Sequence, residues 1–196
     1  MKKNIFFINI NEKILILFLI LFSLLINQYY GNKGVLPMDS FFVFDSGYYV
    51  LNDIHPFKDY WSITGPTLDY LQALFFLIFG TNWFGYVLHA SIVNLVLTVF
   101  SYLVFVNLGL NKIYSFIYSL GIALLAYPNI GVPFVDHHST IFSVLAIYCF
   151  ILGIKKENNF FWFFIPLLLG LSFFSKQIPA AYIIILLTAT SFFYFF

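Results

Sequence analysis

Residues 68–79 of the chain read LDYLQALFFLIF, an apolar run interrupted mainly by Asp69 and Gln72. As a helix with a rise of 1.5 Å per residue, this run is only about 18 Å long. The hydrocarbon core of a bilayer is about 30 Å thick, so a helix needs about 20 apolar residues to cross it. We therefore expect an interfacial or re-entrant helix here, with a short span as the alternative. The direction of every later segment depends on which of these forms.

Six longer apolar segments surround this run, and each is expected to form a transmembrane helix. They cover residues 13–30, 84–106, 113–127, 138–154, 160–174 and 179–196. Hydrophobic residues make up 62% of the chain and charged residues 9%, whereas a soluble domain carries about 25% charged residues. A soluble globule and a disordered chain are thereby excluded. The sequence predicts an all-α, polytopic membrane helical bundle of about six transmembrane helices.

The remaining composition excludes other classes of protein. A net charge of +1 provides no basic footprint for a nucleic-acid partner. Cys149 is the one cysteine, so the chain has no internal disulfide and no Cys/His zinc pattern. We expect residues 1–196 to form a single transmembrane domain. The apolar ending SFFYFF, with no polar flank, suggests a truncated reading frame or a fragment of a longer protein.

The distribution of the nine lysines distinguishes the two topologies, and lysine is the only residue to count because the sequence contains no arginine. If residues 68–79 do not cross and the N-terminus is cytoplasmic, six lysines lie inside, and Lys33, Lys58 and Lys176 lie outside. If the run crosses, four lie inside and five outside. Because lysine is enriched in cytoplasmic loops, we expect a multi-pass protein with a cytoplasmic N-terminus. We expect its membrane to be the plasma (inner) membrane. The outer loop 31–82 then carries short interfacial helices, and all six aspartates lie outside.

Residues 31–67 form the one long polar segment, which mixes aspartate, histidine, Gly-Pro and aromatic residues. Loops of this kind commonly carry functional side chains on a rigid scaffold. The aromatic residues either stack on a sugar ring or sit in the interfacial aromatic belt; they are Tyr48, Tyr49, Tyr60 and Trp61. Asp45 is either a functional carboxylate or the acid near the start of a short amphipathic helix over 44–51, where the helix dipole favours it.

Several short motifs occur in a recognisable order. They are Asp45 with Tyr48-Tyr49, Pro56-Phe57-Lys58-Asp59-Tyr60, Gly65-Pro66, residues 70–76 and 79–80, Asp136 in FVDHH, and GLSFFSKQ at 170–177. This order resembles the N-terminal part of GT-C superfamily membrane glycosyltransferases, in the branch of the protein O-mannosyltransferases and aminoarabinose transferases. The chain departs from that pattern at two positions. Ser46 stands where the family usually has an acidic residue, and Thr64-Gly65-Pro66 stands where the family has a lysine followed by Pro-Pro.

The resemblance implies transfer of a sugar from a polyprenyl-phosphate donor to an acceptor glycan, lipid or protein on the outer side, with inversion. It implies that Asp45 is the catalytic base, which takes the proton of the acceptor. Lys176 and Lys58 are then the candidate ligands of the donor phosphate, and Asp136 is a second acidic site. Lys176 also has the alternative of snorkelling to the membrane surface.

Asp136, His137 and His138 are in addition candidate ligands of a divalent metal ion, because carboxylate and imidazole both bind such ions. Neighbouring histidines on a helix point about 100° apart, so the alternative is a polar loop in which Asp136 caps the fourth span. His89 lies within the second span. It is either a hydrogen-bonded contact between helices or a functional group at depth.

Two other classes of function compete with the enzyme. The first is a transporter or flippase component. Transporters, however, place charged sites near the membrane midplane, and the predicted spans contain no aspartate or glutamate. The second is a non-catalytic membrane assembly subunit, which the short length favours and the dense polar loop does not.

Overall fold

The computed structural model describes residues 11–34 and 39–195, and this part of the chain forms eight helices. They are α1 (Glu12–Gly31), α2 (Asp39–Leu51), α3 (Thr67–Phe79), α4 (Trp83–Asn107), α5 (Lys112–Leu125), α6 (Val135–Lys156), α7 (Asn159–Phe173) and α8 (Gln177–Phe195). Within the described residues, β pairing is limited to an isolated bridge between Pro56 and Tyr60. The all-helical expectation is confirmed.

Asparagine side chains start four of these helices. Asn11, Asn82, Asn111 and Asn158 each accept a hydrogen bond from a backbone N–H of the following first turn. Such caps satisfy donors that have no partner inside the helix. Because the caps are local, the six spans expected from the sequence begin and end within three residues of the observed helices.

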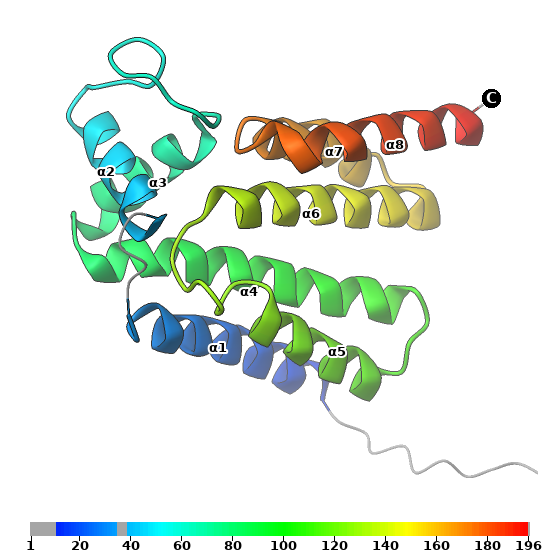
Figure 1. Cartoon of the computed structure of the whole chain (residues 1–196). Coiled ribbons are helices and arrows are strands. Elements are labelled where there is room, and N and C mark those ends of the chain that lie inside the picture. Colours follow the sequence, from blue (N-terminus) through cyan, green and yellow to red (C-terminus); the bar gives the residue numbers. More distant parts are fainter. Residues whose placement is uncertain (1–10, 35–38, 196) are drawn as a thin grey trace, which may run out of the picture.

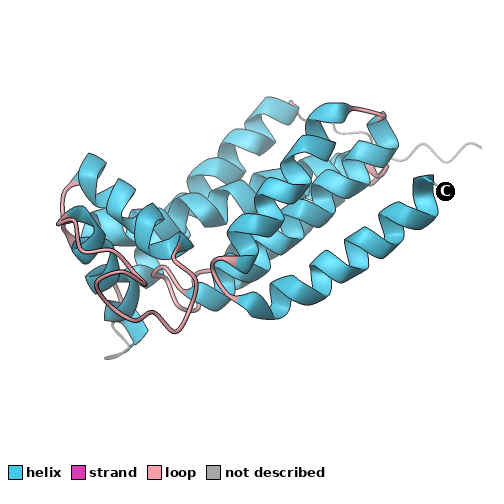
Figure 2. Ribbon diagram, turned by 90° about the horizontal axis from the view of Figure 1, so that it is seen from above, coloured by secondary structure: helices cyan, strands magenta, loops and turns pink. Residues whose placement is uncertain are grey.

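Six helices, α1 and α4–α8, run side by side with alternating direction, while α2 and α3 lie together at one end (Figure 1). The long loops gather at the same end (Figure 2). There the Trp83 indole Nε1 donates to the Gly31 carbonyl over 3.1 Å, which joins the start of α4 to the end of α1. The segment between them therefore returns to the end of the bundle that it left. We call this end the loop end and the opposite one the lysine end.

Four helices, α1, α4, α6 and α8, are long and apolar enough to cross a membrane. Helices α5 and α7 are apolar but have only 14 and 15 residues. Helix α3 has 13 residues, as its short apolar run predicted. The structure thus has the helices of a membrane protein, while the number of six spans stays a prediction.

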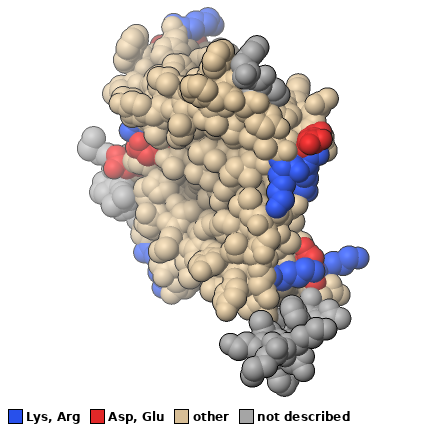
Figure 3. Space-filling view, turned by 90° about the vertical axis from the view of Figure 1, so that its right-hand side faces the viewer, with Lys and Arg blue, Asp and Glu red and all other residues tan. Residues whose placement is uncertain are grey.

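The charged residues divide between the two ends. At the lysine end, the Lys112 ammonium lies 2.6 Å from the Glu12 carboxylate, and Lys155 donates to the Asn107 carbonyl. Figure 3 looks onto this end, where the blue and red atoms are few and most of the surface is tan. The six aspartates lie at the loop end, in α2, in the loop between α2 and α3, in α3 and in the first turn of α6 (Figure 1).

Small and polar residues allow α1 to approach α4 and the connection 126–134 closely. A Cβ atom on Gly31 would meet Val87 Cγ1 at 2.5 Å and the Gly131 carbonyl oxygen at 2.7 Å. One turn earlier, the Asn27 amide donates to Ser91 Oγ over 2.9 Å and to the same Gly131 carbonyl over 3.2 Å. Helices in lipid associate through such close approaches and interhelical hydrogen bonds, since lipid tails are as apolar as the helix surfaces.

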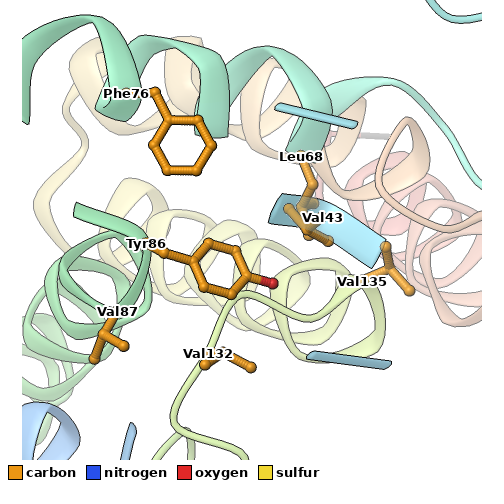
Figure 4. Close-up of a cluster of buried hydrophobic side chains, with 7 residues drawn as sticks. All are labelled: Val43, Leu68, Phe76, Tyr86, Val87, Val132 and Val135. Atoms are coloured by element: carbon orange, nitrogen blue, oxygen red, sulfur yellow. The ribbon is translucent and has the colours of Figure 1, made fainter. Parts of the chain in front are cut away.

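A cluster of buried side chains holds α2 and α3 onto the bundle (Figure 4). The Tyr86 ring of α4 lies among the side chains of Val43 from α2, Leu68 from α3 and Val135 from α6. All four are at most 9% exposed. The cluster therefore sets where the acidic residues of α2, α3 and α6 lie.

Two of the alternatives that the sequence left open, both about helix starts, are wrong. Helix α2 begins at Asp39, so Asp45 lies in its middle and is not the acid of a first turn. Helix α6 begins at Val135 with Phe134 at the cap position, so Asp136 lies inside the first turn and does not cap the helix. Helix α2 begins at residue 39 instead of the expected 44, and α6 begins at 135 instead of 138. Val43 and Val135 lie in the added parts of these helices, and their packing in the buried cluster stabilises them.

We predict that Gly31→Ala destabilises the protein by about 1–3 kcal/mol, because the added methyl group must displace Val87 or the backbone of Gly131. Gly121→Ala is the matched control. No atom lies within 4 Å of a Cβ built at Gly121, and alanine is the better helix former. Thermal unfolding of the detergent-solubilised variants measures both effects. Equal melting temperatures for the two variants would contradict the close contact.

Candidate functional site

An ion pair between Asp136 and Lys176 lies at the loop end. The Lys176 ammonium donates to Asp136 Oδ1. Asp136 comes from the first turn of α6, and Lys176 from the connection between α7 and α8. Both side chains are about two-fifths exposed. The structure thus brings together two charges that lie 40 residues apart in the chain.

Serine contacts between α6 and α7 hold the backbone on which Lys176 sits. The Ser139 hydroxyl lies 2.9 Å from the Lys176 carbonyl oxygen, to which it donates. Ser172 Oγ in turn donates to the Ser139 carbonyl over 2.6 Å and lies 2.8 Å from Ser143 Oγ. All three serines are buried. Because their side chains are small, α6 and α7 pack closely, and the position of Lys176 relative to α6 is well defined.

The Gly65-Pro66 motif of the first loop docks beside the same connection. The Gly65 and Thr67 N–H groups donate to the carbonyls of Ser175 and Phe174 over 3.3 and 3.1 Å. A Cβ atom on Gly65 would lie 1.9 Å from the Phe174 carbonyl oxygen, so no residue with a side chain fits there. This contact brings the start of α3 next to the residue that precedes Lys176.

Asp69, on α3, has a buried carboxylate that sequence reasoning did not single out. The Ser46 hydroxyl donates to Oδ1 over 2.7 Å, and the Tyr60 hydroxyl donates to Oδ2 over 2.9 Å. Asp69 is 1% exposed, and burial raises the pKa of its carboxyl group. Burial, followed by the nearby Asp69 carboxylate, also raises the pKa of the Tyr60 phenol. The acidic residue that the family pattern expects at Ser46 is absent, and Ser46 instead contacts a carboxylate from another helix.

Asp45 lies one residue before Ser46 and is exposed on α2. Its helix is fixed against α3 both by the Ser46–Asp69 hydrogen bond and by Gly47, where a Cβ atom would lie 2.6 Å from Gln72 Cγ. No hydrogen bond or ion pair joins Asp45 to Asp136 or Lys176 within the described residues. The predicted base and the predicted phosphate ligand therefore occupy the same end of the protein without direct contact.

Lys58 is a solvated side chain on the loop between α2 and α3. Its ammonium lies 3.6 Å from the Asp59 carboxylate, and the Lys58 side chain is 73% exposed. The His55 N–H donates to Asp59 Oδ2 over 2.9 Å, and this hydrogen bond lowers the pKa of Asp59. Trp61, on the same loop, is 83% exposed. Both the aromatic belt and a sugar contact remain compatible with that exposure.

Two of the three residues considered as metal ligands bind other side chains, while the buried Nδ1 of His137 has no hydrogen-bond partner among the described residues. Asp136 pairs with Lys176. His138 Nε2 lies 3.1 Å from His89 Nε2, and His138 Nδ1 lies 2.6 Å from the Tyr127 hydroxyl oxygen. Neither ring nitrogen of His138 is open to a further ligand. Across residues 11–34 and 39–195, no group of three or more His, Cys, Asp or Glu side chains could hold a metal ion. The residues present do not fit the predicted site.

Two adjoining apolar pockets lie along α6, one beside α4 and the connection after α5 and the other between α4, α5 and α6, and we call them together the groove. Its end near the ion pair has a volume of about 260 Å³ and is lined by Asp136, His137 and Thr140 together with apolar residues. A larger part of about 570 Å³ continues to Phe105, Tyr118 and Tyr148. The two parts share Leu97, Ala126 and Val144. The groove thus has one polar end and an otherwise apolar lining.

Comparison of the chain with protein-family models, with curated proteins and with solved structures finds no match.

We predict that the stability of the protein falls as the pH rises through the raised pKa of Asp69, because ionisation leaves a buried carboxylate with no cation. The stabilising effect of the protonated form is fully present below the unfolded-state pKa of about 3.9. Asp69→Asn, which does not ionise, should remove this decline from a series of thermal unfolding curves recorded at rising pH.

Asp59→Asn is the matched control, since the pKa of Asp69 is raised whereas the pKa of Asp59 is lowered. Its contribution to stability is present above about pH 3.9 and is lost as the pH falls through the folded-state pKa. The variant should therefore leave the decline toward high pH in place. A decline that survives in Asp69→Asn would show that another group causes it.

Proposed function

We propose that the chain belongs to a membrane glycosyltransferase of the GT-C type, or forms its N-terminal part. It moves a sugar from a polyprenyl-phosphate donor to an acceptor glycan, lipid or protein at the loop end. The observation that carries the proposal is the Asp136–Lys176 ion pair at the polar end of an apolar groove. A phosphate joined to a long isoprenoid chain has the same division into one charged end and an apolar tail.

The length of the groove suits the tail of such a donor. From Asp136 to Tyr148, which line its two ends on α6, the helix rises about 18 Å. This is more than half of the hydrocarbon thickness of about 30 Å. An isoprenoid chain in the groove would replace contacts with lipid tails, while its phosphate stays at the membrane surface.

Lys176 supplies the charge that meets the phosphate. Its ion pair with Asp136 is partly exposed on both sides, and such pairs contribute only about 0–1 kcal/mol. A phosphate group can therefore replace the Asp136 carboxylate at little cost, with a charge-assisted hydrogen bond in its place. Lys58, on the exposed loop, is the second candidate ligand for the phosphate.

The reaction is a single displacement at the anomeric carbon. Asp45 takes the proton of the acceptor hydroxyl, whose oxygen forms the new bond to that carbon. The bond between the carbon and the phosphate oxygen breaks, and the electron pair leaves with the polyprenyl phosphate. Lys176 offsets the negative charge that develops on this leaving group. The position of Asp45 on an exposed face of α2 allows an acceptor to approach it from water.

The lysine distribution supports an orientation with the loop end outside the cell. Lys13, Lys112, Lys155 and Lys156 lie at the ends of helices at the lysine end. Lysines favour the cytoplasmic side, which puts the N-terminus there in a plasma (inner) membrane. A divalent metal ion is not part of this mechanism, because Asp136, His137 and His138 do not converge as ligands.

A lipid-binding flippase component or assembly subunit is the second candidate, and the same groove favours it. Such a protein would bind the polyprenyl phosphate without transferring a sugar. The loss of transfer in a base variant that still binds the lipid therefore separates the two functions.

We predict that Asp45→Asn lowers sugar transfer at least 100-fold in membranes from cells that express the complete gene, because general-base catalysis contributes about 10²–10⁴-fold. The assay follows labelled sugar from the polyprenyl-phosphate donor to the acceptor fraction. Asp53→Asn, on the exposed loop after α2, is the matched control and should transfer at the wild-type rate. Wild-type transfer by Asp45→Asn would remove Asp45 as the base.

Cysteines introduced at positions 45, 136 and 176 should all react with a membrane-impermeant reagent from the same side. This measurement confirms insertion of the variants. Reaction from opposite sides would contradict a common site.

We predict that Lys176→Gln weakens binding of polyprenyl phosphate about tenfold, as expected for loss of a hydrogen bond to a charged group. Val144→Trp should also weaken binding, because the indole fills the groove. Lys33→Gln is the control for the loss of one positive charge at the same end. Native mass spectrometry of protein in lipid nanodiscs containing polyprenyl phosphate measures all three. Equal binding by wild type, Lys176→Gln and Val144→Trp would place the lipid elsewhere.

A further inference from the structure

Four buried polar side chains form a continuous hydrogen-bonded chain across the loop end. Gln72 Oε1 lies 2.9 Å from His89 Nδ1, the two histidine Nε2 atoms lie 3.1 Å apart, and His138 Nδ1 lies 2.6 Å from the Tyr127 hydroxyl oxygen. The Phe134 N–H donates to that same hydroxyl oxygen over 2.9 Å. Each of the four side chains is at most 1% exposed. The expected interhelical contact of His89 is confirmed by these hydrogen bonds.

The direction of hydrogen bonding follows from the end at Gln72 when both imidazoles are neutral. The Gln72 carbonyl oxygen can only accept, so His89 Nδ1 carries the proton and donates to it. His89 Nε2 then accepts from His138 Nε2, and His138 Nδ1 accepts the hydrogen of the Tyr127 hydroxyl. In the reverse direction, His138 Nδ1 would donate to the Phe134 carbonyl, 3.2 Å away. The Tyr127 hydrogen would then have no acceptor among these contacts.

The hydrogen-bonded chain of side chains connects the two parts of the proposed site. Gln72 lies three residues after Asp69 on α3, and its side chain packs against Gly47, two residues after Asp45 on α2. His138 lies two residues after Asp136 on α6. His89, on α4, bridges them. The Phe75 ring stacks on His89 with centroids 4.6 Å apart, which restricts the orientation of the imidazole.

The ends of the chain argue against a path for protons. One end is a side-chain amide and the other a backbone N–H, and neither releases a proton readily. Gln72 Nε2 and Tyr127, at the two ends, are buried away from water. The hydrogen-bonded chain instead fixes relative positions, because each hydrogen bond sets both the distance and the orientation of two groups on different elements.

We propose that the Gln72–His89–His138–Tyr127 chain is a positioning strut. It sets the separation between the carboxylates of α2 and α3 and the Asp136–Lys176 pair. His89 and His138 act as neutral links that each accept one hydrogen bond and donate another. They are positioning residues for the proposed transfer reaction, and that last role rests on the proposed function. The strut itself does not.

Two variants of His89 test the strut, because they differ in hydrogen bonding and both retain a long side chain. His89→Gln can accept from His138 and donate to Gln72, whereas His89→Leu can do neither. Spin labels at Leu74 on α3 and Thr140 on α6, both exposed positions, report the separation of the two helices in lipid nanodiscs. Cys149→Ala removes the native cysteine.

In His89→Leu, we expect the distribution of label-to-label distances to at least double in width, while His89→Gln retains the wild-type distribution. A label pair at Leu25 on α1 and Val96 on α4 is the control for the rest of the bundle and should not change. An unchanged distribution in His89→Leu would overturn the proposal. An equal change in His89→Leu and His89→Gln would do so as well, since it would show that side-chain shape rather than hydrogen bonding sets the separation.

If the control pair also changes in His89→Leu, the bundle itself is disturbed and Gln72→Met decides. This variant keeps the length of the side chain and removes the hydrogen bond from His89 to α3, so a broadened distance between positions 74 and 140 supports the strut and an unchanged one contradicts it. In the transfer assay, His89→Leu should lower kcat about 100-fold, as for a misplacement of about 1 Å, with little change in KM for the donor. His89→Gln should restore the rate. If the wild type transfers no sugar, the proposed function fails, while the distance measurement still decides the strut.

Discussion

The return of the chain between α1 and α4 is the constraint on which the arrangement of the protein depends. Helix α3 has 13 residues and lies with α2 at the loop end instead of running along the bundle (Figure 1). Helix α4 therefore begins beside the end of α1, where the Trp83 indole donates a hydrogen bond to the Gly31 carbonyl. This return makes α4 antiparallel to α1 and so sets the direction of every later helix. It also gathers the aspartates and Lys176 at one end, where the groove begins.

The charged groups at this end are held with very different strength. Asp69 is buried and bonded by two hydroxyl groups from α2 and its loop, so it binds those elements together. The Asp136–Lys176 pair is partly exposed and can be exchanged for a ligand. Between them, the buried histidine pair and its two partners connect α3 to α6. A rigid framework that presents exchangeable charges at the surface suits a site for a charged lipid headgroup.

Sequence reasoning found the helices well and their partners poorly. The asparagine caps and the apolar runs are local signals, and the predicted spans agree with the observed helices. Asp45 lies in the middle of α2 instead of near a helix start, and Asp136 lies in the first turn of α6 instead of at its cap position. Asp69 was counted among the outer aspartates, but nothing in its neighbours indicated Ser46 or Tyr60 as partners. Those hydroxyl groups lie 23 and nine residues away.

The sequence by itself determined that this is an all-helical membrane protein, where the six apolar helices of the bundle lie, and that the aspartates gather at one end. These properties follow from the hydrophobicity and length of single segments, which neighbouring residues decide. Only the tertiary structure decided that Lys176 meets Asp136, that Asp69 is buried, and that His89 faces His138. The physical reason is that hydrogen bonds and ion pairs depend on distances of a few ångströms between elements far apart in the chain. Those distances arise only when the helices pack, through contacts such as Gly65 against Phe174.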